Sequence, residues 1–212
     1  MKTALVWGAG GGIGQAITAE LVASNWQVVA LGRHLAPVDG VAQLTIEADV
    51  AHEYDVQNGV MAAGMEIETA DLYVYCVGDI MAQSVADMEF SQWQRILDAN
   101  LTGAFLTTHH SLPLLAPDAA LIFLGAVSER LQLPKLSAYA AAKAGLEAFA
   151  ESLRKEERRR QVLVVRPGAV ATPLWDKVPM KQPTNAPFPE KVAKRILKAY
   201  DEGHSGPLDL VS

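Results

Sequence analysis

Short apolar runs alternate with amphipathic stretches along the whole chain. Residues 4–7 form the first run, and after the glycines that follow, apolar positions at spacings of three and four predict a helix over residues 13–23. Further runs typical of buried strands cover residues 27–31, 43–47, 71–77, 119–124, 161–165 and 207–211. Helical patterns cover residues 89–115, with a weak point near Pro113, and residues 138–157 and 190–202. Strands separated by helices need crossover connections, so the pattern predicts an α/β fold with a doubly wound, mostly parallel seven-stranded sheet and helices on both faces.

The turn after the first strand is rich in glycine, with Gly8, Gly10, Gly11, Gly12 and Gly14. A buried strand that ends in glycines and leads into a helix lets backbone N–H groups approach a pyrophosphate, which a Cβ atom would obstruct. The sequence therefore predicts a nucleotide site here. The alternative is a glycine-rich loop that only turns the chain.

The composition narrows the class of protein. With 212 residues, half of them hydrophobic, the chain can bury a substantial core, and we expect a single domain over residues 1–212. A formal charge of -6 disfavours a nucleic-acid partner, which requires a basic face. The single Cys76 excludes an internal disulfide, and no apolar run is long enough to span a bilayer. We expect a cytoplasmic protein without a membrane partner.

Tyr139 and Lys143 stand four residues apart on a predicted helix that we expect Ser137 to cap. This spacing places both side chains on one face, toward the strand ends. A tyrosine has a pKa near ~10, so acid–base work near neutrality requires a shift of about three units, or ~4 kcal/mol. A neighbouring ammonium has the sign that such a shift needs. The alternative is an ordinary Tyr–Lys pair, which is common on helices.

Six short motifs follow one another along the chain. They are Gly8-x-x-x-Gly12-Ile13-Gly14, Asp49-Val50, Gly78, Asn100-Leu101-Thr102-Gly103, Tyr139-x-x-x-Lys143 and Pro167-Gly168-x-Val170-x-Thr172. With these motifs in this order, the chain resembles the short-chain dehydrogenase/reductase family over nearly its whole length. The resemblance implies a Rossmann-type sheet that binds NAD or NADP, with hydride transfer between the nicotinamide and a small-molecule carbonyl or alcohol.

The resemblance also implies roles for single residues. Tyr139 would give or take the hydroxyl proton, Lys143 would hold the nicotinamide ribose and lower the tyrosine pKa, and Asn100 would position a water in the proton relay. For Asn100 the alternative is an asparagine that bonds its own helix backbone. The residues expected to bind the cofactor are Gly8, Gly11, Gly12, Ile13, Gly14, Arg33, Asp49, Val50, Val77, Gly78, Tyr139, Lys143, Pro167, Gly168, Val170 and Thr172.

Cofactor choice depends on the end of the second strand. NAD binders of this type carry an acid there, whereas this chain has Arg33 and no acid until Asp39. Arg33 could pair with a 2'-phosphate, so we expect NADP, with NAD as the alternative. The competing interpretation is that Arg33 is only a surface arginine.

The chain departs from the family pattern at several positions. Trp7 and Tyr75-Cys76-Val77 replace polar residues that usually tie the glycine loop to the next strand, and we expect apolar packing there that leaves no buried polar group unpaired. Ala126 stands where the catalytic serine is expected, thirteen residues before Tyr139, and Ser128 lies two residues further on. Either Ser128 or no residue replaces that serine. A cofactor-binding redox sensor or interaction protein with an impaired active site is therefore the alternative function.

Three further expectations concern the surroundings of the site. The adjacent His109 and His110 point in different directions on a helix, so we expect no metal. Residues 171–189, rich in proline and polar residues, are a candidate substrate-covering loop in which Trp175 is a candidate lining residue. The helices at residues 91–115 and 138–157 carry more apolar surface than one sheet covers, which predicts a homodimer or homotetramer.

Overall fold

The computed structural model describes residues 1–127 and 133–210. It contains a seven-stranded parallel sheet with the strand order β3-β2-β1-β4-β5-β6-β7. The strands are β1 Thr3–Trp7, β2 Gln27–Gly32, β3 Leu44–Glu47, β4 Ala70–Tyr75, β5 Leu115–Leu124, β6 Gln161–Pro167 and β7 Gly206–Leu210. Because the order reverses between β1 and β4, a crevice forms where their carboxyl ends diverge, and such crevices bind ligands in open α/β sheets. The predicted fold class is confirmed.

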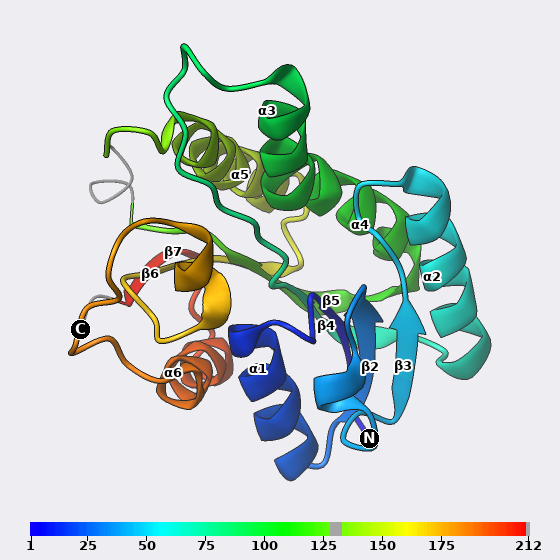
Figure 1. Ribbon diagram of the computed structural model, residues 1–212. Coiled ribbons are helices and arrows are strands. Elements are labelled where there is room, and N and C mark those ends of the chain that lie inside the picture. The colour runs from blue at the N-terminus through cyan, green and yellow to red at the C-terminus, as the bar shows by residue number, and fades with distance from the viewer. Residues whose placement is uncertain (128–132, 211–212) are drawn as a thin grey trace.

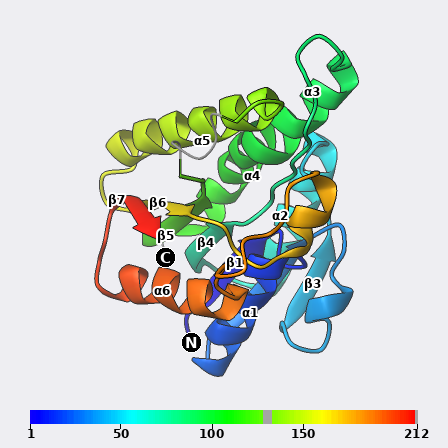
Figure 2. The same ribbon diagram turned by 60° about the vertical axis from the view of Figure 1, so that its left-hand side comes forward.

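Helices cover both faces of the sheet (Figures 1 and 2). One face carries α1 Gly12–Ala23 and α6 Pro189–Asp201, and the other carries α2 Glu53–Glu66, α4 Gly103–Ser111 and α5 Ser137–Glu156. Alternate side chains of each strand point to opposite faces of the sheet and pack in two separate cores. In β1, Leu5 and Trp7 pack on the α2–α4–α5 side, whereas Ala4 and Val6 pack on the α1–α6 side. Central strands buried on both sides explain why the sequence shows continuous apolar runs.

The predicted helix over residues 89–115 is interrupted, and not only near Pro113, where a weak point was expected. The structure divides this stretch into α3 Phe90–Leu97, a π-helical segment Asp98–Thr102, α4, and a 3₁₀ turn Leu112–Leu114 that leads directly into β5. Pro113 cannot donate a helical hydrogen bond, so α4 ends before it. The strand β5 accordingly begins four residues earlier than residue 119, the predicted start. Helix α2 was not anticipated, because its apolar pattern is weak.

Two local predictions are also wrong. Ser137 is not the cap of α5 but its first residue, and its buried hydroxyl has no hydrogen-bond partner among the described residues. The apolar packing expected at Trp7 is present, but it leaves one polar group unpaired, contrary to the expectation. Its ring is fully buried near Gly59 of α2, and its Nε1 has no partner in the described part of the chain. The large ring of Trp7 therefore packs against the small Gly59, and its indole N–H remains an unpaired donor among the described residues.

Within residues 1–127 and 133–210, no helix has both the length and the apolar character that a bilayer crossing requires. The same residues contain no group of three or more His, Cys, Asp or Glu side chains arranged to hold a metal ion.

Candidate active site

The glycine turn between β1 and α1 is a tight cradle. Gly8 has a φ of +80°, and its N–H donates to the Leu31 carbonyl at 2.8 Å, which ties the turn to β2. A Cβ atom on Gly14 would overlap the carbonyl oxygen of Gly8. The N-cap Gly11 has no side chain to bond the first turn of α1, so the N–H groups there remain available to an anion. The cradle therefore has the form that a pyrophosphate requires.

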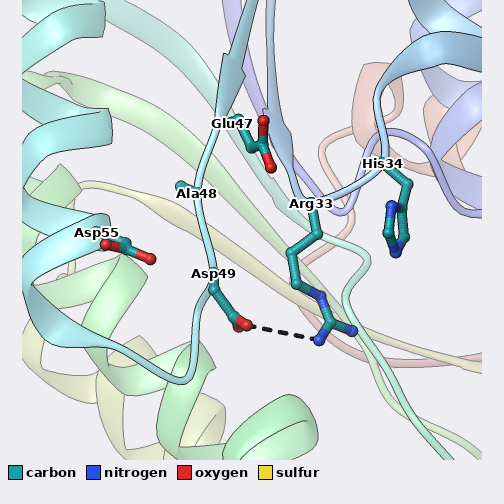
Figure 3. Close-up of a pocket in the computed structure, with 6 residues that line it drawn as sticks. All are labelled: Arg33, His34, Glu47, Ala48, Asp49 and Asp55. Carbon is teal, nitrogen blue, oxygen red and sulfur yellow. Dashed lines mark hydrogen bonds and ion pairs between the residues drawn. The ribbon is translucent and has the colours of Figure 1, made fainter.

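Arg33 lies in an open pocket of about 540 Å³ beside this cradle (Figure 3). Its side chain, 55% exposed, points toward Asp49, with Nη1 and Oδ2 3.5 Å apart. Glu47 and Asp55 line the same pocket, together with His34 and Ala48. The pocket thus contains one arginine and three carboxylates.

Glu47 was missed at this site. The prediction of NADP rested on the second strand and the residues directly after it, which contain no acid before Asp39. In the sheet, however, Glu47 at the end of β3 is the register partner of Gly32 at the end of β2. An acid therefore does stand beside the end of β2, supplied by the neighbouring strand. The short third strand in the sequence was the signal that could have indicated it.

Tyr139 and Lys143 lie on one face of α5, as the spacing predicts. The Lys143 Nζ donates to the carbonyl oxygen of Leu124 at 2.7 Å and stands 5.8 Å from the centre of the Tyr139 ring. Both side chains are nearly buried. Burial lowers the pKa of Lys143 to about 8 and raises the pKa of Tyr139 to about 12. The direction for Tyr139 is opposite to the expected one, because burial disfavours the charged phenolate.

Asn100 is fully buried in the π-helical segment. Its Nδ2 donates to the backbone carbonyls of Asp79 at 2.7 Å and Ile96 at 2.8 Å, and the second bond is the helix-backbone alternative. Its Oδ1 has no partner among the described residues. A Cβ atom on Gly78 would lie 3.3 Å from this oxygen and 3.8 Å from the Lys143 Nζ. The structure thus brings Asn100 and Lys143 to the same side of Gly78.

The other expected cofactor residues follow the carboxyl ends of the strands. Asp49 accepts a bond from the Ala51 N–H and lines the pocket, whereas Val50 is buried against Gly103 of α4 and does not. Ile13 and Val77 are half-buried beside the two cores, Pro167 ends β6, and Gly168 and Val170 follow it.

A Cβ atom on Gly12 would lie 2.8 Å from Cγ2 of Thr172, so the loop after β6 reaches the glycine cradle. The Trp175 Nε1 donates to the Val170 carbonyl at 2.8 Å and braces that loop.

The departures from the family pattern lie at the same edge. Ala126 is half-buried just after β5 and packs beside the cluster that contains Tyr139. Ser128 lies outside the described residues, so its replacement of the expected serine stays a prediction. Burial raises the pKa of Cys76 to about 12, which holds it as an unreactive thiol beside the α1–α6 core.

Asp79, directly after Gly78, is the second residue that sequence reasoning missed. It is 7% exposed and joins Arg95 of α3 and Lys177 of the loop after β6. The signal was an acid within an apolar run, Val77-Gly78-Asp79-Ile80, where a carboxylate needs a partner.

Comparison with known proteins identifies the family to which this chain belongs. A sequence model described as short chain dehydrogenase matches residues 2–183. An uncharacterised short-chain type dehydrogenase/reductase of Sinorhizobium fredii is 34% identical over 190 residues, which cover 82% of this chain and 33% of that protein. An uncharacterised oxidoreductase of Staphylococcus epidermidis is 29% identical over 185 residues, which cover 82% of this chain and 80% of that protein. The chain therefore belongs to the short-chain dehydrogenase family of oxidoreductases.

Solved structures share the fold. An alcohol dehydrogenase of Thermococcus sibiricus, complexed with 5-hydroxy-NADP, has a TM-score of 0.89 at 20% identity and covers 99% of this chain and 96% of its own. A 3-ketoacyl-(acyl-carrier-protein) reductase of Brucella melitensis, complexed with NADH, has a TM-score of 0.88 at 22% identity with the same coverage. The predicted membership of the family is confirmed.

Proposed function

We propose that residues 1–212 form a single catalytic domain that transfers a hydride between a nicotinamide cofactor and a small-molecule carbonyl or alcohol. One observation carries the proposal. Tyr139, Lys143 and Asn100 come together at the carboxyl edge of the sheet, where the glycine cradle lies. This arrangement combines an acid, a cation and an amide with a dinucleotide site.

The residues present fit such a cofactor. The cradle has no room for a Cβ atom at Gly14, and Gly8 is in a conformation that side chains disfavour, so both positions favour close backbone approach. The bound nicotinamide supplies or accepts the hydride. The amides at the start of α1 would bind the pyrophosphate, and Lys143, whose Nζ donates to the Leu124 carbonyl, would hold the ribose.

Tyr139 acts as the acid in the reductive direction. With its pKa raised to about 12, it keeps its proton at neutral pH and can donate it to the oxygen of a carbonyl substrate. Lys143, with a pKa of about 8, is mostly an ammonium at pH 7 and stabilises the phenolate that donation leaves. The unpartnered Oδ1 of Asn100 can accept a hydrogen bond from the relay water that restores the proton.

For the cofactor we propose NADP, with NAD as the alternative. Arg33 supports NADP, since its pair with Asp49 is long and half-exposed and therefore weak, so a 2'-phosphate can displace it. Glu47 and Asp55 oppose NADP, because carboxylates in the same pocket repel that phosphate. Arg33→Ala should remove a preference for NADPH over NADH, and Glu47→Gln should increase it. Fluorescence titration with both nucleotides measures this.

A second candidate function has its own support. Ala126 lacks the hydroxyl that the family resemblance leads us to expect beside the substrate oxygen. A cofactor-binding redox sensor retains Lys143 and the glycine cradle but needs no substrate donor. The two functions differ in one property, since only the enzyme turns over a substrate in a manner that requires Tyr139.

For assembly we propose a homodimer or homotetramer through α4 and α5. Phe105 on α4 is 49% exposed, stacks on His109 with ring centres 5.7 Å apart and meets Phe149 of α5 edge-on at 6.4 Å. An exposed aromatic cluster across two helices is typical of a contact surface.

The experiment that tests the function is a turnover assay. Purified protein with NADPH or NADH should reduce activated ketones, aldehydes or quinones, and Tyr139→Phe should lose that activity while it still binds the nucleotide. Cofactor binding without Tyr139-dependent turnover across the panel would favour the sensor.

A further inference from the structure

Asp79 is a buried carboxylate beside the candidate active site, in the segment that follows β4. Its side chain is only 10% exposed, and both oxygens are engaged. The Lys177 Nζ donates to Oδ1 at 2.6 Å, and the Ile80 N–H also donates to Oδ1 at 3.0 Å. The Arg95 Nε forms an ion pair with Oδ2 at 3.1 Å. One carboxylate therefore joins the segment after β4 to α3 and to the helical turn Pro173–Lys177.

The two cations and the carboxylate differ in burial. The side chains of Lys177 and Arg95 are 50% and 57% exposed, so each keeps much of its hydration. The carboxylate of Asp79 has lost most of its water and depends on these partners. The contact from Lys177 therefore compensates a buried charge, which a surface ion pair would not do.

The turn that carries Lys177 also covers apolar groups of the site. Leu174 and Val178, which flank Lys177 in the chain, pack in the same cluster as Tyr139 and Leu136. The ion pair and this apolar contact hold one segment in one place. Release of the ion pair would loosen the cover next to Tyr139.

Asp79 is connected to the proton relay as well. Its backbone carbonyl accepts the hydrogen bond from Nδ2 of Asn100 at 2.7 Å. The side chain of Asp79 thus fixes the covering turn, and its backbone fixes the amide that we assign to the relay.

We propose that Asp79 is a positioning residue that holds the turn Pro173–Lys177 closed over Tyr139 through Lys177. Its influence on catalysis rests on the proposed carbonyl reduction. Its influence on the turn does not depend on any reaction, so the two can be tested separately.

The test combines hydrogen exchange with steady-state kinetics on the full chain. Asp79→Asn keeps the shape and the backbone carbonyl but removes the charge, and Lys177→Met removes the cation. Each single variant should speed exchange of the amides of residues 174–178 about fivefold and raise KM for the carbonyl substrate by a similar factor, with kcat nearly unchanged. The double variant should show little further effect, because both changes break the same contact.

Two variants separate positioning from general stability. Lys177→Arg keeps a cation and should restore most of the wild-type KM and exchange rate. Lys181→Met removes an exposed lysine of the same loop, which has no ion pair within the described residues, and should change neither.

Unchanged exchange in Asp79→Asn, or effects of the two single variants that multiply in the double variant, would overturn the proposal whatever the activity. Faster exchange in both variants, with no turnover in any protein including wild type, would leave the positioning of the turn intact and contradict the proposed reaction instead.

Discussion

The nearly buried Lys143 predicts an unusual dependence of stability on pH. Burial lowers its pKa from 10.5 to about 8. The group is 5% exposed, so solvent screens this effect little. Below pH 8 the folded protein bears the full cost of a buried ammonium. Between pH 8 and 10.5 the unfolded chain binds more protons than the folded chain, so this residue makes stability rise with pH.

The magnitude follows from the two pKa values. The gap between 10.5 and about 8 corresponds to about 3 kcal/mol of unfolding free energy, gained as the pH rises through that interval. Cys76 has the opposite effect on stability from pH 9 upward. Burial raises its pKa from 9.0 to about 12, so in this range the thiol loses its proton in the unfolded chain but keeps it in the folded protein, and stability falls as the pH rises. The thiol is present in both wild type and Lys143→Met, so the part of its contribution that comes from burial cancels in their difference, whereas its direct interaction with Lys143 does not.

Urea unfolding of wild type and Lys143→Met at a series of pH values between 7 and 11 measures this. The variant also loses the bond to the Leu124 carbonyl, which shifts its curve by a constant amount. The difference, wild type minus variant, should increase by about 3 kcal/mol across the interval and stay flat below pH 8. Parallel curves, or a difference that decreases with pH, would refute the reasoning.

Three further outcomes are expected. Ala126→Ser should raise turnover of activated carbonyls by about a hundredfold or more if the introduced hydroxyl reaches the substrate oxygen, as measured by initial rates. Gly14→Ala should abolish nucleotide binding because its Cβ would overlap the Gly8 carbonyl, whereas Gly12→Ala should weaken binding only a few fold, because the side chain that it meets can shift; calorimetric titration distinguishes the two. Phe105→Asp should produce monomers in sedimentation at micromolar concentration if α4 forms the proposed contact.

The parallel, seven-stranded sheet was accessible to sequence reasoning because the central strands are buried on both faces, whereas the order of the strands was not predicted. Such strands must be apolar throughout, as in β1 and β4, and the glycines after β1 mark the ligand edge. Helix α2 was harder to predict, because only Val56, Gly59 and Ala63 are buried and a wide polar surface hides the periodicity. Within residues 89–115, Pro113 is a local signal for the end of α4. The π-helical segment has no such signal, and the residue after it, Gly103, lies close to Val50 and Tyr75, which are far away in the chain.

At the site, residues on one element could be predicted and contacts between elements could not. Tyr139 and Lys143 share a helix face by spacing alone, and the structure places them accordingly. The effect of Glu47 on the pocket required the β2–β3 register, and the role of Asp79 required three segments far apart in the chain. The direction of the Tyr139 pKa required knowledge of its burial, which disfavours the charged phenolate.

The central claim is hydride transfer that depends on Tyr139. NADPH that carries deuterium at its transferable position, incubated with the protein and a panel of ketones, aldehydes and quinones, tests it directly by mass spectrometry of the products. The expected result is deuterium on the former carbonyl carbon with the wild-type protein and a loss of that label with Tyr139→Phe. Tight nucleotide binding with no label in any product would contradict the claim and favour the alternative function, a cofactor-binding redox sensor.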